Sequence, residues 1–308
     1  MDVGQDSKSR HLFSFLSLVR PIVVYNNRLF LDMSKGCGQA MFAGSKKYTI
    51  ALKVCVLFPI LVFAGCYQPT EYPQIVTTLP AKGVPAPAIP TQYRIAGTSV
   101  QGRPIMYTVL GQGPDVTLIV AAIHGNEPAG TALVRRLAEH LKQNQHLLQG
   151  RMVVLLPVAN PDGAAYNTRY NANKVDLNRN FATANRINNT EFGRTALSEP
   201  ETSAIYQLLW QYNPDRIVSI HQSMGCIDYD GPGYGLASRM AQYCNLPIKK
   251  LGAKPGSLGS YAGLTLGVPI ITLELSQSDS GLGSENLWRQ YGKALLAAVT
   301  YPETVASK

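Results

Sequence analysis

Runs of Val, Ile and Leu alternate with amphipathic segments along the chain from about residue 92 onward. Several runs are apolar at successive positions, as expected for strands that are buried on both faces. The alternation predicts an α/β fold: a single domain, residues 92–305, with a central, mostly parallel or mixed twisted sheet flanked by helices on both faces. The expected strands are 105–110, 116–123, 152–158, 216–220 and 268–275, and the expected helices are 128–142, 199–212, 235–243 and 285–300.

The region before the second expected helix has two features of its own. An Asn-rich stretch, residues 160–189, has little periodicity, and loops of this length inside compact domains are usually functional. The helix then opens with Ser198-Glu199-Pro200-Glu201, which has the spacing of a capping box and a Pro in the first turn.

The basic balance of the chain lies largely in its front segment. The formal net charge is +9, but residues 1–66 carry 8 Lys and Arg against 3 Asp and Glu, a surplus of +5. Residues 67–308 carry 20 against 16, a surplus of only +4. We therefore expect no nucleic-acid partner, because the charge does not gather on the predicted domain.

A charge-free run, residues 54–65, follows Lys46-Lys47 and ends at Cys66. The run is too short to span a bilayer comfortably and is typical of a signal-peptide core. The small residues before Cys66 resemble a bacterial lipoprotein processing site, which predicts a lipoprotein-type signal over residues 41–66 with Cys66 as the lipidated residue. An ordinary membrane anchor or an uncleaved signal is the alternative.

Segments on either side of this signal complete the expected organisation. Translation is expected to begin at Met41, with residues 1–40 a non-native extension, and residues 67–91 form a Pro-rich tether. The protein would then be anchored to the membrane by lipid in the bacterial cell envelope, facing the periplasm or the surface, and would be cytoplasmic if the signal is not used. Cys226 and Cys244 could form a disulfide in an exported protein or stay as two buried thiols.

Three side chains that can bind a metal lie at the ends of two expected strands. His124 and Glu127 follow the apolar run that ends at Ile123, and His221 ends the run 216–220. Imidazole and carboxylate ligands suit zinc, and two His with one Glu leave a fourth position open. This is the pattern of a catalytic rather than a structural zinc site.

Other candidate residues are weaker when each is taken alone. Arg169, Asn178 and Arg179 lie in the long loop and could bind a carboxylate, although most Arg side chains are solvated at the surface. Glu274 is a single carboxylate in an apolar strand, so it faces a cleft, pairs with a cation or points outward near an edge. In a cleft beside zinc it could accept a proton from water.

Taken together, the motifs resemble those of the zinc carboxypeptidases, in particular the small bacterial murein peptide amidase branch. The resemblance covers residues 92–300 and rests on several motifs in order. They are His124-Gly125-Asn126-Glu127, Asn160-Pro161-Asp162-Gly163, the stretch 169–181, Ser219-Ile220-His221-Gln222, Ile227-Asp228-Tyr229-Asp230-Gly231-Pro232 and the stretch 256–274.

The resemblance implies a role for each matching residue. Zinc would be held by His124, Glu127 and His221, and Glu274 would be the general base. Arg169 would stabilise the oxyanion, and Asn178 and Arg179 would bind the free carboxylate of the released residue. Asp176 would hydrogen-bond to the ring of the first zinc His, and residues 256–261 would line the pocket for the leaving residue.

The sequence departs from the family pattern at a few positions. Lys174 stands where the family usually has Gly, and Asn126 replaces a common Asp. The Tyr that caps the substrate in the family could be Tyr229, Tyr234 or Tyr261. Leu258 and Gly259 offer no acid at the pocket positions, which argues against Lys or Arg as the leaving residue.

The resulting expectation is a zinc-dependent amidase that cleaves an amide bond next to a residue with a free carboxylate. By resemblance, the substrate is the γ-D-glutamyl–diaminopimelate bond of murein peptides. One alternative is an N-acyl amino acid deacylase like succinylglutamate desuccinylase or aspartoacylase, because His-Gly-Asn-Glu suits that relative too. Another is a non-catalytic lipoprotein that binds the cell wall, which the full set of expected catalytic side chains disfavours.

Overall fold

The computed structural model describes residues 24–25, 28–29 and 93–302. Strands β1 (Val24–Tyr25) and β2 (Arg28–Leu29) pair antiparallel with each other. The expected signal with Cys66 and the expected tether, residues 67–91, lie outside the described residues, as does most of the expected extension 1–40. These expectations therefore stay predictions.

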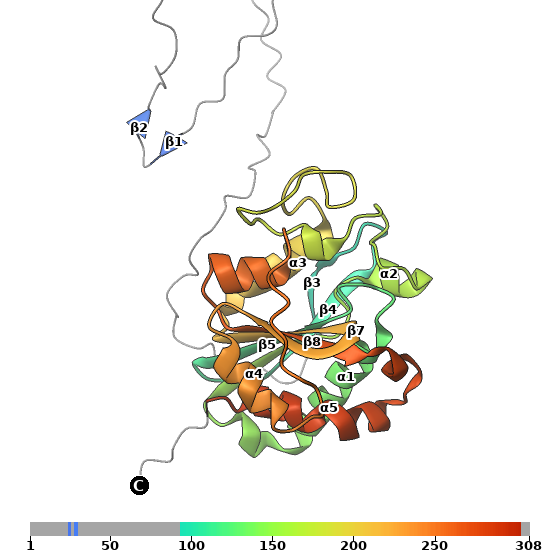
Figure 1. Ribbon diagram of the computed structural model, residues 1–308, viewed down its shortest axis with the longest axis vertical. Coiled ribbons are helices and arrows are strands. Elements are labelled where there is room, and N and C mark those ends of the chain that lie inside the picture. Colours follow the sequence, from blue (N-terminus) through green and yellow to red (C-terminus); the bar gives the residue numbers. More distant parts are fainter. Residues whose placement is uncertain (1–23, 26–27, 30–92, 303–308) are drawn as a thin grey trace, which may run out of the picture. The chain divides into compact units, whose positions relative to one another are not determined.

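A six-stranded mixed sheet forms the centre of the domain (Figure 1). Its strands, in chain order, are β3 (Tyr93–Thr98), β4 (Pro104–Gly111), β5 (Asp115–Ala121), β6 (Arg151–Leu156), β7 (Arg216–Asp230) and β8 (Ile270–Ser276). Their spatial order is β3-β4-β6-β5-β7-β8. Strand β5 runs parallel to β6 and β7, β7 begins parallel to β8, and β3 and β4 are antiparallel to their neighbours. The predicted α/β architecture is confirmed.

Helices cover both faces of this sheet (Figure 1). Helices α1 (Pro128–Gln143), α4 (Tyr234–Ala241) and α5 (Ser284–Val299) pack on one face. Helix α3 (Pro200–Tyr212) packs on the other, together with a π-helical turn, Ser260–Thr265. The short helix α2 (Pro161–Tyr166) follows β6. None of the described helices is long and apolar enough to cross a membrane.

Strand β5 shows why its sequence is apolar throughout. Successive side chains of a strand point to opposite faces, and Leu118 and Val120 pack in the α3 core whereas Ile119 and Ala121 pack in the α1 core. Each of these four side chains has an exposed fraction of 0%. Because both faces are filled, the carboxyl end of β5 is held firmly where His124 follows.

Strand β7 differs most from the expected strands, because it continues ten residues past the predicted end at Ile220. Its first half pairs parallel with β8, where His221 lies opposite Glu274. Its second half turns back and pairs along β8 in the opposite direction, so that Cys226 also lies opposite Glu274. The segment 222–230 gave no strand signal in the sequence, because Gly225, Asp228 and Asp230 interrupt its apolar residues. The described thiols of Cys226 and Cys244 are both free, so they form no disulfide with each other.

Two further local features differ from the sequence analysis. The edge strand β3 was not predicted, because it is short and each of its side chains is exposed or half-buried, so it leaves no buried apolar run. The predicted capping box at Ser198 is wrong: Glu199 is the N-cap of α3 and makes no side-chain cap bond. Ser198 donates to Glu199 Oε1 at 2.8 Å instead, and Glu201 turns to partners outside the helix.

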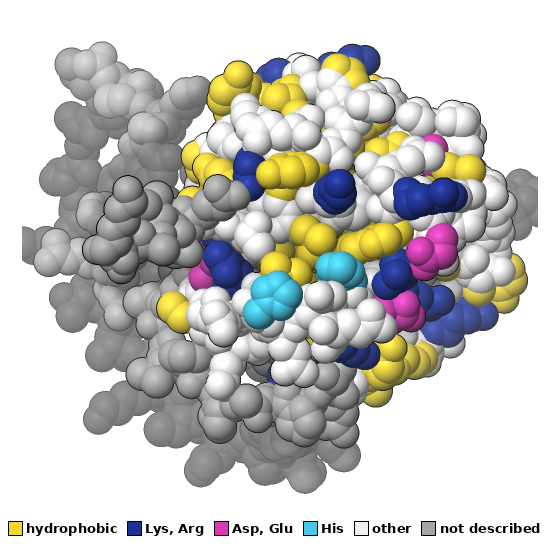
Figure 2. All heavy atoms as spheres, turned by 90° about the horizontal axis from the view of Figure 1, so that it is seen from below, with side chains coloured by type: hydrophobic (Ala, Val, Ile, Leu, Met, Phe, Trp, Pro, Cys, Tyr) yellow, Lys and Arg dark blue, Asp and Glu magenta, His cyan; other side chains and the backbone are white. Residues whose placement is uncertain are grey.

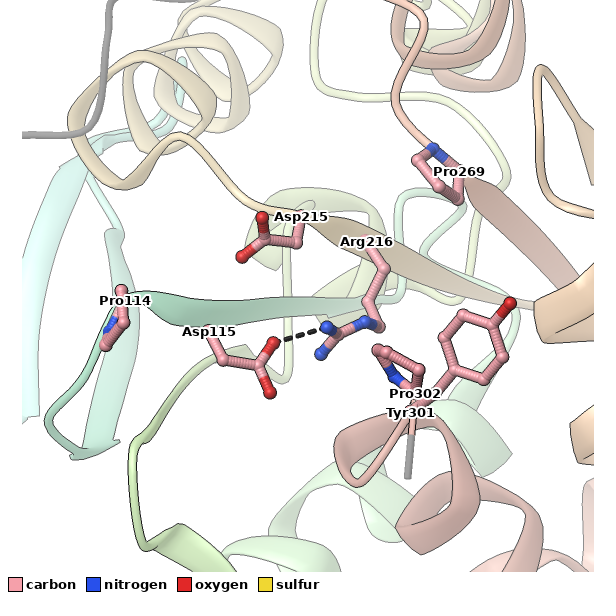
Figure 3. Close-up of a pocket in the computed structure, with 7 residues that line it drawn as sticks. All are labelled: Pro114, Asp115, Asp215, Arg216, Pro269, Tyr301 and Pro302. Atoms are coloured by element: carbon pink, nitrogen blue, oxygen red, sulfur yellow. Dashed lines mark hydrogen bonds and ion pairs between the residues drawn. The ribbon is translucent and has the colours of Figure 1, made fainter. Parts of the chain in front are cut away.

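One face of the domain and a hollow at the amino ends of β5 and β7 give no strong sign of another site. Figure 2 shows one face of the domain, on which basic side chains lie among acidic and apolar ones rather than in one continuous stripe. A hollow of about 390 Å³ lies at the amino ends of β5 and β7, beside Asp115 and Arg216. These two side chains form an ion pair with each other (Figure 3), and Arg216 also donates to Thr117 Oγ1 at 2.7 Å. The main polar groups of this hollow are therefore already partnered.

Candidate metal centre

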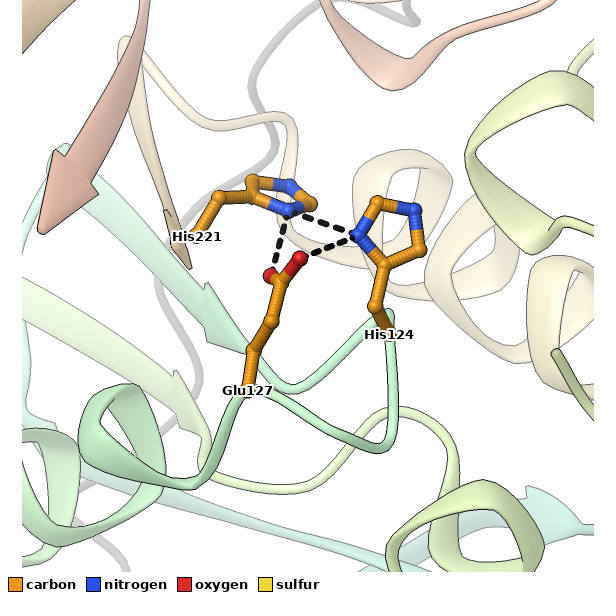
Figure 4. Close-up of side chains that lie close together, drawn as sticks. All are labelled: His124, Glu127 and His221. Carbon is orange, nitrogen blue, oxygen red and sulfur yellow. Dashed lines mark hydrogen bonds and ion pairs between the residues drawn. The ribbon is translucent and has the colours of Figure 1, made fainter. Parts of the chain in front are cut away.

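The structure brings His124, Glu127 and His221 together where β5 ends and where the segment of β7 that pairs with it ends (Figure 4). The Nδ1 atom of His124 lies 2.8 Å from Glu127 Oε1, and the Nδ1 atom of His221 lies 2.9 Å from Glu127 Oε2. The two Nδ1 atoms are 3.2 Å apart. All three residues are buried. The predicted set of three therefore converges, although His221 is far from the other two in sequence.

A tight turn after β5 places the first two residues of this set. Ala122 has a φ of +50°, and a Cβ on Gly125 would lie 1.9 Å from the carbonyl carbon of Gly163. Only glycine permits this approach. Asn160 fixes the opposing segment, because its Oδ1 accepts from Gly163 N at 2.8 Å and its Nδ2 donates to Ile123 O at 3.3 Å. The turn ends at Glu127, the N-cap of α1.

Each His ring has a second partner on the side away from the cluster. The Nε2 atom of His124 lies 3.1 Å from Asp176 Oδ1, and the Nε2 atom of His221 lies 3.0 Å from Ser219 Oγ. When each Nε2 carries the proton and donates it to this oxygen, each Nδ1 presents a lone pair to the cluster. Such outer partners fix both the tautomer and the orientation of a metal-binding His.

Charges in this buried region shift the pKa values of the carboxylates. Burial opposes ionisation of Glu127, but the attraction of His221 and the hydrogen bonds from both rings outweigh it and lower the pKa of Glu127 to about 2. Asp176 is also buried, yet its hydrogen bond with His124 and the charge of Arg169 hold its pKa well below the usual range. Both groups are therefore carboxylates at neutral pH, the form that a cation requires.

These donors fit zinc. Bonds of about 2.0–2.2 Å in a tetrahedral arrangement place zinc ligand atoms roughly 3.3 Å apart. The two Nδ1 atoms, at 3.2 Å, already have nearly this separation. Two unprotonated nitrogens and a carboxylate so close together repel one another unless a proton or a cation lies between them. Residues His124, Glu127 and His221 would hold the ion, with the fourth position open to the site.

Arg169 lies beside the cluster, as predicted. Its Nε and Nη2 atoms donate to Asp176 Oδ2 at 3.1 and 2.8 Å. Its Nη1 atom lies 3.4 Å from His124 Nδ1 and 4.0 Å from Glu127 Oε1. The ion pair with Asp176 thus directs Nη1 of Arg169 towards the side chains that would hold the ion.

Asn178 and Arg179 form a donor pair against the segment predicted to line the pocket. Asn178 Oδ1 accepts from Leu258 N at 2.9 Å, which leaves its amide NH₂ for another partner. No carboxylate among the described residues is within ion-pair distance of Arg179, and burial lowers the pKa of its guanidinium. A half-buried cation with no anionic partner is suited to bind an anion.

Glu274 reaches the same end of the sheet from β8. It lies opposite His221 in the strand register, and Met224 N donates to its Oε2 at 3.5 Å. Burial, together with repulsion from Glu127, raises the pKa of Glu274 despite the attraction of His221. The carboxylate therefore lies next to the metal ligands without belonging to their cluster.

Some residues behave differently from what the sequence indicated. Lys174 has a φ of +62°, which explains why glycine suits this position. Tyr261 is 1% exposed and stacks on Phe181, so it is too enclosed to cap a substrate, whereas Tyr234 is 61% exposed.

Two contacts near the site were not predicted. Ser219 received no role from the sequence, although its spacing of two residues from His221 on a strand places both on one face. Asp230 lies beside Gly259, where a Cβ would be 2.4 Å from its Oδ2, and pairs with Lys250 at 3.2 Å. Because Lys250 already balances this acid, Asp230 adds no net charge to the predicted pocket.

We expect the purified protein to bind one zinc ion per chain through this cluster. Replacing His221 by Ala removes a ligand, so zinc affinity measured by competition with a chromogenic chelator should fall at least 100-fold. The matched control is His146→Ala, because His146 is exposed on a 3₁₀ turn. Equal zinc affinity of the His221 variant and the control would contradict the assignment.

Comparisons with known proteins agree with this site. The zinc carboxypeptidase family matches residues 86–232. Murein peptide amidase A of Escherichia coli is 34% identical over 208 residues, which cover 61% of this chain and 83% of that protein. The Vibrio campbellii protein of the same name is 32% identical over 220 residues, which cover 64% and 83%.

Solved structures give the same result. The murein-tripeptide amidase of Escherichia coli O157 matches with a TM-score of 0.50 and 27% identity, over 70% of this chain and 98% of that one. Carboxypeptidase A of Helicoverpa armigera, at 20% identity, shares the fold with a TM-score of 0.59 over 70% of each chain. The chain therefore belongs to the zinc carboxypeptidase family of hydrolytic metallopeptidases.

Proposed function

We propose that the enzyme hydrolyses the amide bond before a residue with a free carboxylate, and that its substrate is the γ-D-glutamyl–diaminopimelate bond of murein peptides. One observation carries the reaction class: Asn178 and Arg179 lie in the same loop as Arg169, which reaches the metal ligands. Arg179 donates to Asn178 O at 2.6 Å but has no carboxylate partner among the described residues, and the amide NH₂ of Asn178 remains available. The names of the murein peptide amidase relatives support the choice of substrate.

In this proposal Glu274 moves the proton. Zinc at the cluster would lower the pKa of water and polarise the scissile carbonyl. Glu274 accepts a proton from the water that attacks the carbonyl carbon and then donates it to the leaving nitrogen, so that the C–N bond breaks into a carboxylate and an amine. Its raised pKa suits both acceptance and return of this proton.

Arg169 and the donor pair act on the substrate oxygens. The Nη1 edge of Arg169 faces the metal ligands, so it can stabilise the negative charge that develops on the carbonyl oxygen. Arg179 and the free amide of Asn178 bind the terminal carboxylate, which places the scissile bond a fixed distance from the metal. Binding at both ends therefore orients the amide for attack.

The alternatives predict different substrates. A deacylase would use the same metal and base on an N-acyl amino acid. A cell-wall-binding protein without activity would need neither a general base such as Glu274 nor the cations Arg169 and Arg179 near the metal ligands. The relatives found by comparison are amidases and carboxypeptidases, which favours the first proposal.

Product analysis tests the substrate directly. We expect mass spectrometry to show release of diaminopimelate from L-Ala-γ-D-Glu-diaminopimelate by the zinc-loaded full chain. The matched control is Glu274→Gln, which should retain zinc but lose at least 100-fold in kcat because a general base contributes about 10²–10⁴. Turnover of N-acyl amino acids alone would favour the deacylase, and undiminished turnover by Glu274→Gln would remove Glu274 from the mechanism.

Arg179 should discriminate between substrates by their terminal group. Arg179→Ala removes the cation that binds the carboxylate, so kcat/KM for a peptide with a free carboxylate should fall about 100-fold, equivalent to roughly 3 kcal/mol. The same peptide with an amidated terminus should lose less than threefold. An equal loss for both peptides would exclude carboxylate binding by Arg179.

We also propose that the domain is tethered to the cell envelope through lipid on Cys66. The short apolar run before Cys66 and the Pro-rich stretch after it support this proposal. N-terminal mapping of the protein from bacterial membranes should find acylated Cys66 as the first residue, and Cys66→Ser should leave the lipid off. Recovery of peptides from residues 1–40, or an unmodified Cys66, would contradict it.

A further inference from the structure

Two buried carboxylates at the start of α3 have no cationic partner. Glu199 is 5% exposed and Glu201 is 0% exposed. Among the described residues, no Lys, Arg or His lies within ion-pair distance of either carboxylate. Burying a carboxylate without a cation is costly unless hydrogen bonds replace the lost water, so their hydrogen-bond partners indicate their purpose.

Both carboxylates accept from the same side-chain amide. Asn171 Nδ2 donates to Glu199 Oε2 at 2.7 Å and to Glu201 Oε2 at 3.0 Å. Asn173 Nδ2 adds a third bond, to Glu199 Oε2 at 2.9 Å. Val100 N donates to the other oxygen of Glu201 at 3.1 Å. The two hydrogens of one buried NH₂ group thus satisfy one oxygen of each acid.

The carbonyl end of the same Asn171 shapes the loop. Its Oδ1 accepts from Asn173 N at 3.1 Å and from Val175 N at 3.0 Å. Its own backbone N donates to Val175 O at 3.1 Å. These bonds close the turn that lies between Arg169 and Asp176 in the chain. The distance between the two members of that ion pair is therefore set by a turn built around Asn171.

A second Asn fixes the far end of the same segment. Asn180 Nδ2 donates to Phe192 O at 2.9 Å and to Ser198 Oγ at 3.1 Å. Its Oδ1 accepts from Glu199 N at 3.2 Å. Residues 176–179, which include Asp176, Asn178 and Arg179, thus lie between two anchors, and Glu199 contacts both of them.

We propose that Glu199, Asn171 and Glu201 form a clamp of positioning residues that sets where Arg169 and Asp176 stand relative to the metal ligands. The inference rests on the proposed function for the role of Arg169, whereas the Asp176–His124 contact at 3.1 Å stands on the structure alone. None of the three clamp residues touches the cluster itself. They act through the turn.

The clamp needs one amide and two acids. An Asp at position 171 would keep the acceptor for the turn but replace the NH₂ group by an oxygen facing two acceptors. Burial raises the pKa of Glu201 in the native arrangement, and a further carboxylate beside it would be costly without a hydrogen-bond donor. A Gln at position 201 would supply an NH₂ group that can donate to this Asp, which relieves one of the two contacts between acceptors, whereas Glu199 keeps only the bond from Asn173 on its Oε2.

The test measures zinc affinity and kinetics on the full chain. Asn171→Asp should weaken zinc binding about tenfold, because misplacing an outer partner of a metal-binding His costs about 10–100-fold. At saturating zinc it should also lower kcat/KM at least tenfold, with a rise in KM. The double variant Asn171→Asp/Glu201→Gln should recover part of both losses, at least threefold in zinc affinity, and Glu201→Gln alone completes the double-mutant cycle.

The matched control is Asn189→Asp, an exposed Asn in the same loop whose Oδ1 accepts from Phe192 N. It should stay within twofold of the wild type. A merely structural role would lower the melting temperature of Asn171→Asp but leave zinc affinity and KM of the folded protein unchanged. That result, or a double variant no better than Asn171→Asp, would overturn the clamp.

Two further outcomes, a variant that does not fold and a wild type without murein hydrolysis, still leave the clamp testable. If Asn171→Asp does not fold, Asn173→Ala serves in its place, because it removes only the bond from Asn173 to Glu199. Its zinc affinity should fall two- to fivefold. Wild-type zinc affinity of this variant would overturn the clamp. If the wild type hydrolyses no murein peptide, the proposed substrate fails, and the zinc measurements alone decide the clamp.

Discussion

The mutual approach of two imidazole nitrogens and one carboxylate in a buried place is the constraint on which the rest of the site depends. With the Nδ1 atoms 3.2 Å apart and both rings hydrogen-bonded through Nε2 to other residues, the cluster needs a positive charge at its centre. A divalent ion meets that need and leaves one coordination position open. The roles proposed for Arg169, Glu274 and Arg179 follow from their positions around this centre.

The sheet brings these side chains together on a rigid support. Strand β5 and the first segment of β7 are adjacent and parallel, and both end at the same edge of the pairing, so His124 and His221 meet there although 97 positions separate them in the chain. Core side chains on both faces hold the strands. The loop 169–181 has no such support from a sheet. Buried Asn side chains and the start of α3 hold it instead.

Much of this could be predicted from the sequence, and the failures have physical reasons. The Val- and Ile-rich strands were found because two-sided burial leaves a continuous apolar run, and the metal ligands were found because they follow such runs. The return half of β7 was missed because Gly225, Asp228 and Asp230 interrupt its apolar residues, and β3 was missed because its side chains are exposed or half-buried. Glu201 was assigned to a capping box, since local spacing cannot reveal a bond to Asn171.

Anomalous X-ray diffraction at the zinc edge, on crystals of the full chain grown with zinc, tests the central claim most directly. We expect one strong peak within about 2.0–2.2 Å of His124 Nδ1, His221 Nδ1 and a Glu127 oxygen, with solvent as the fourth ligand. A fully loaded crystal whose strong peak lies elsewhere, or touches only one of these residues, would contradict the account.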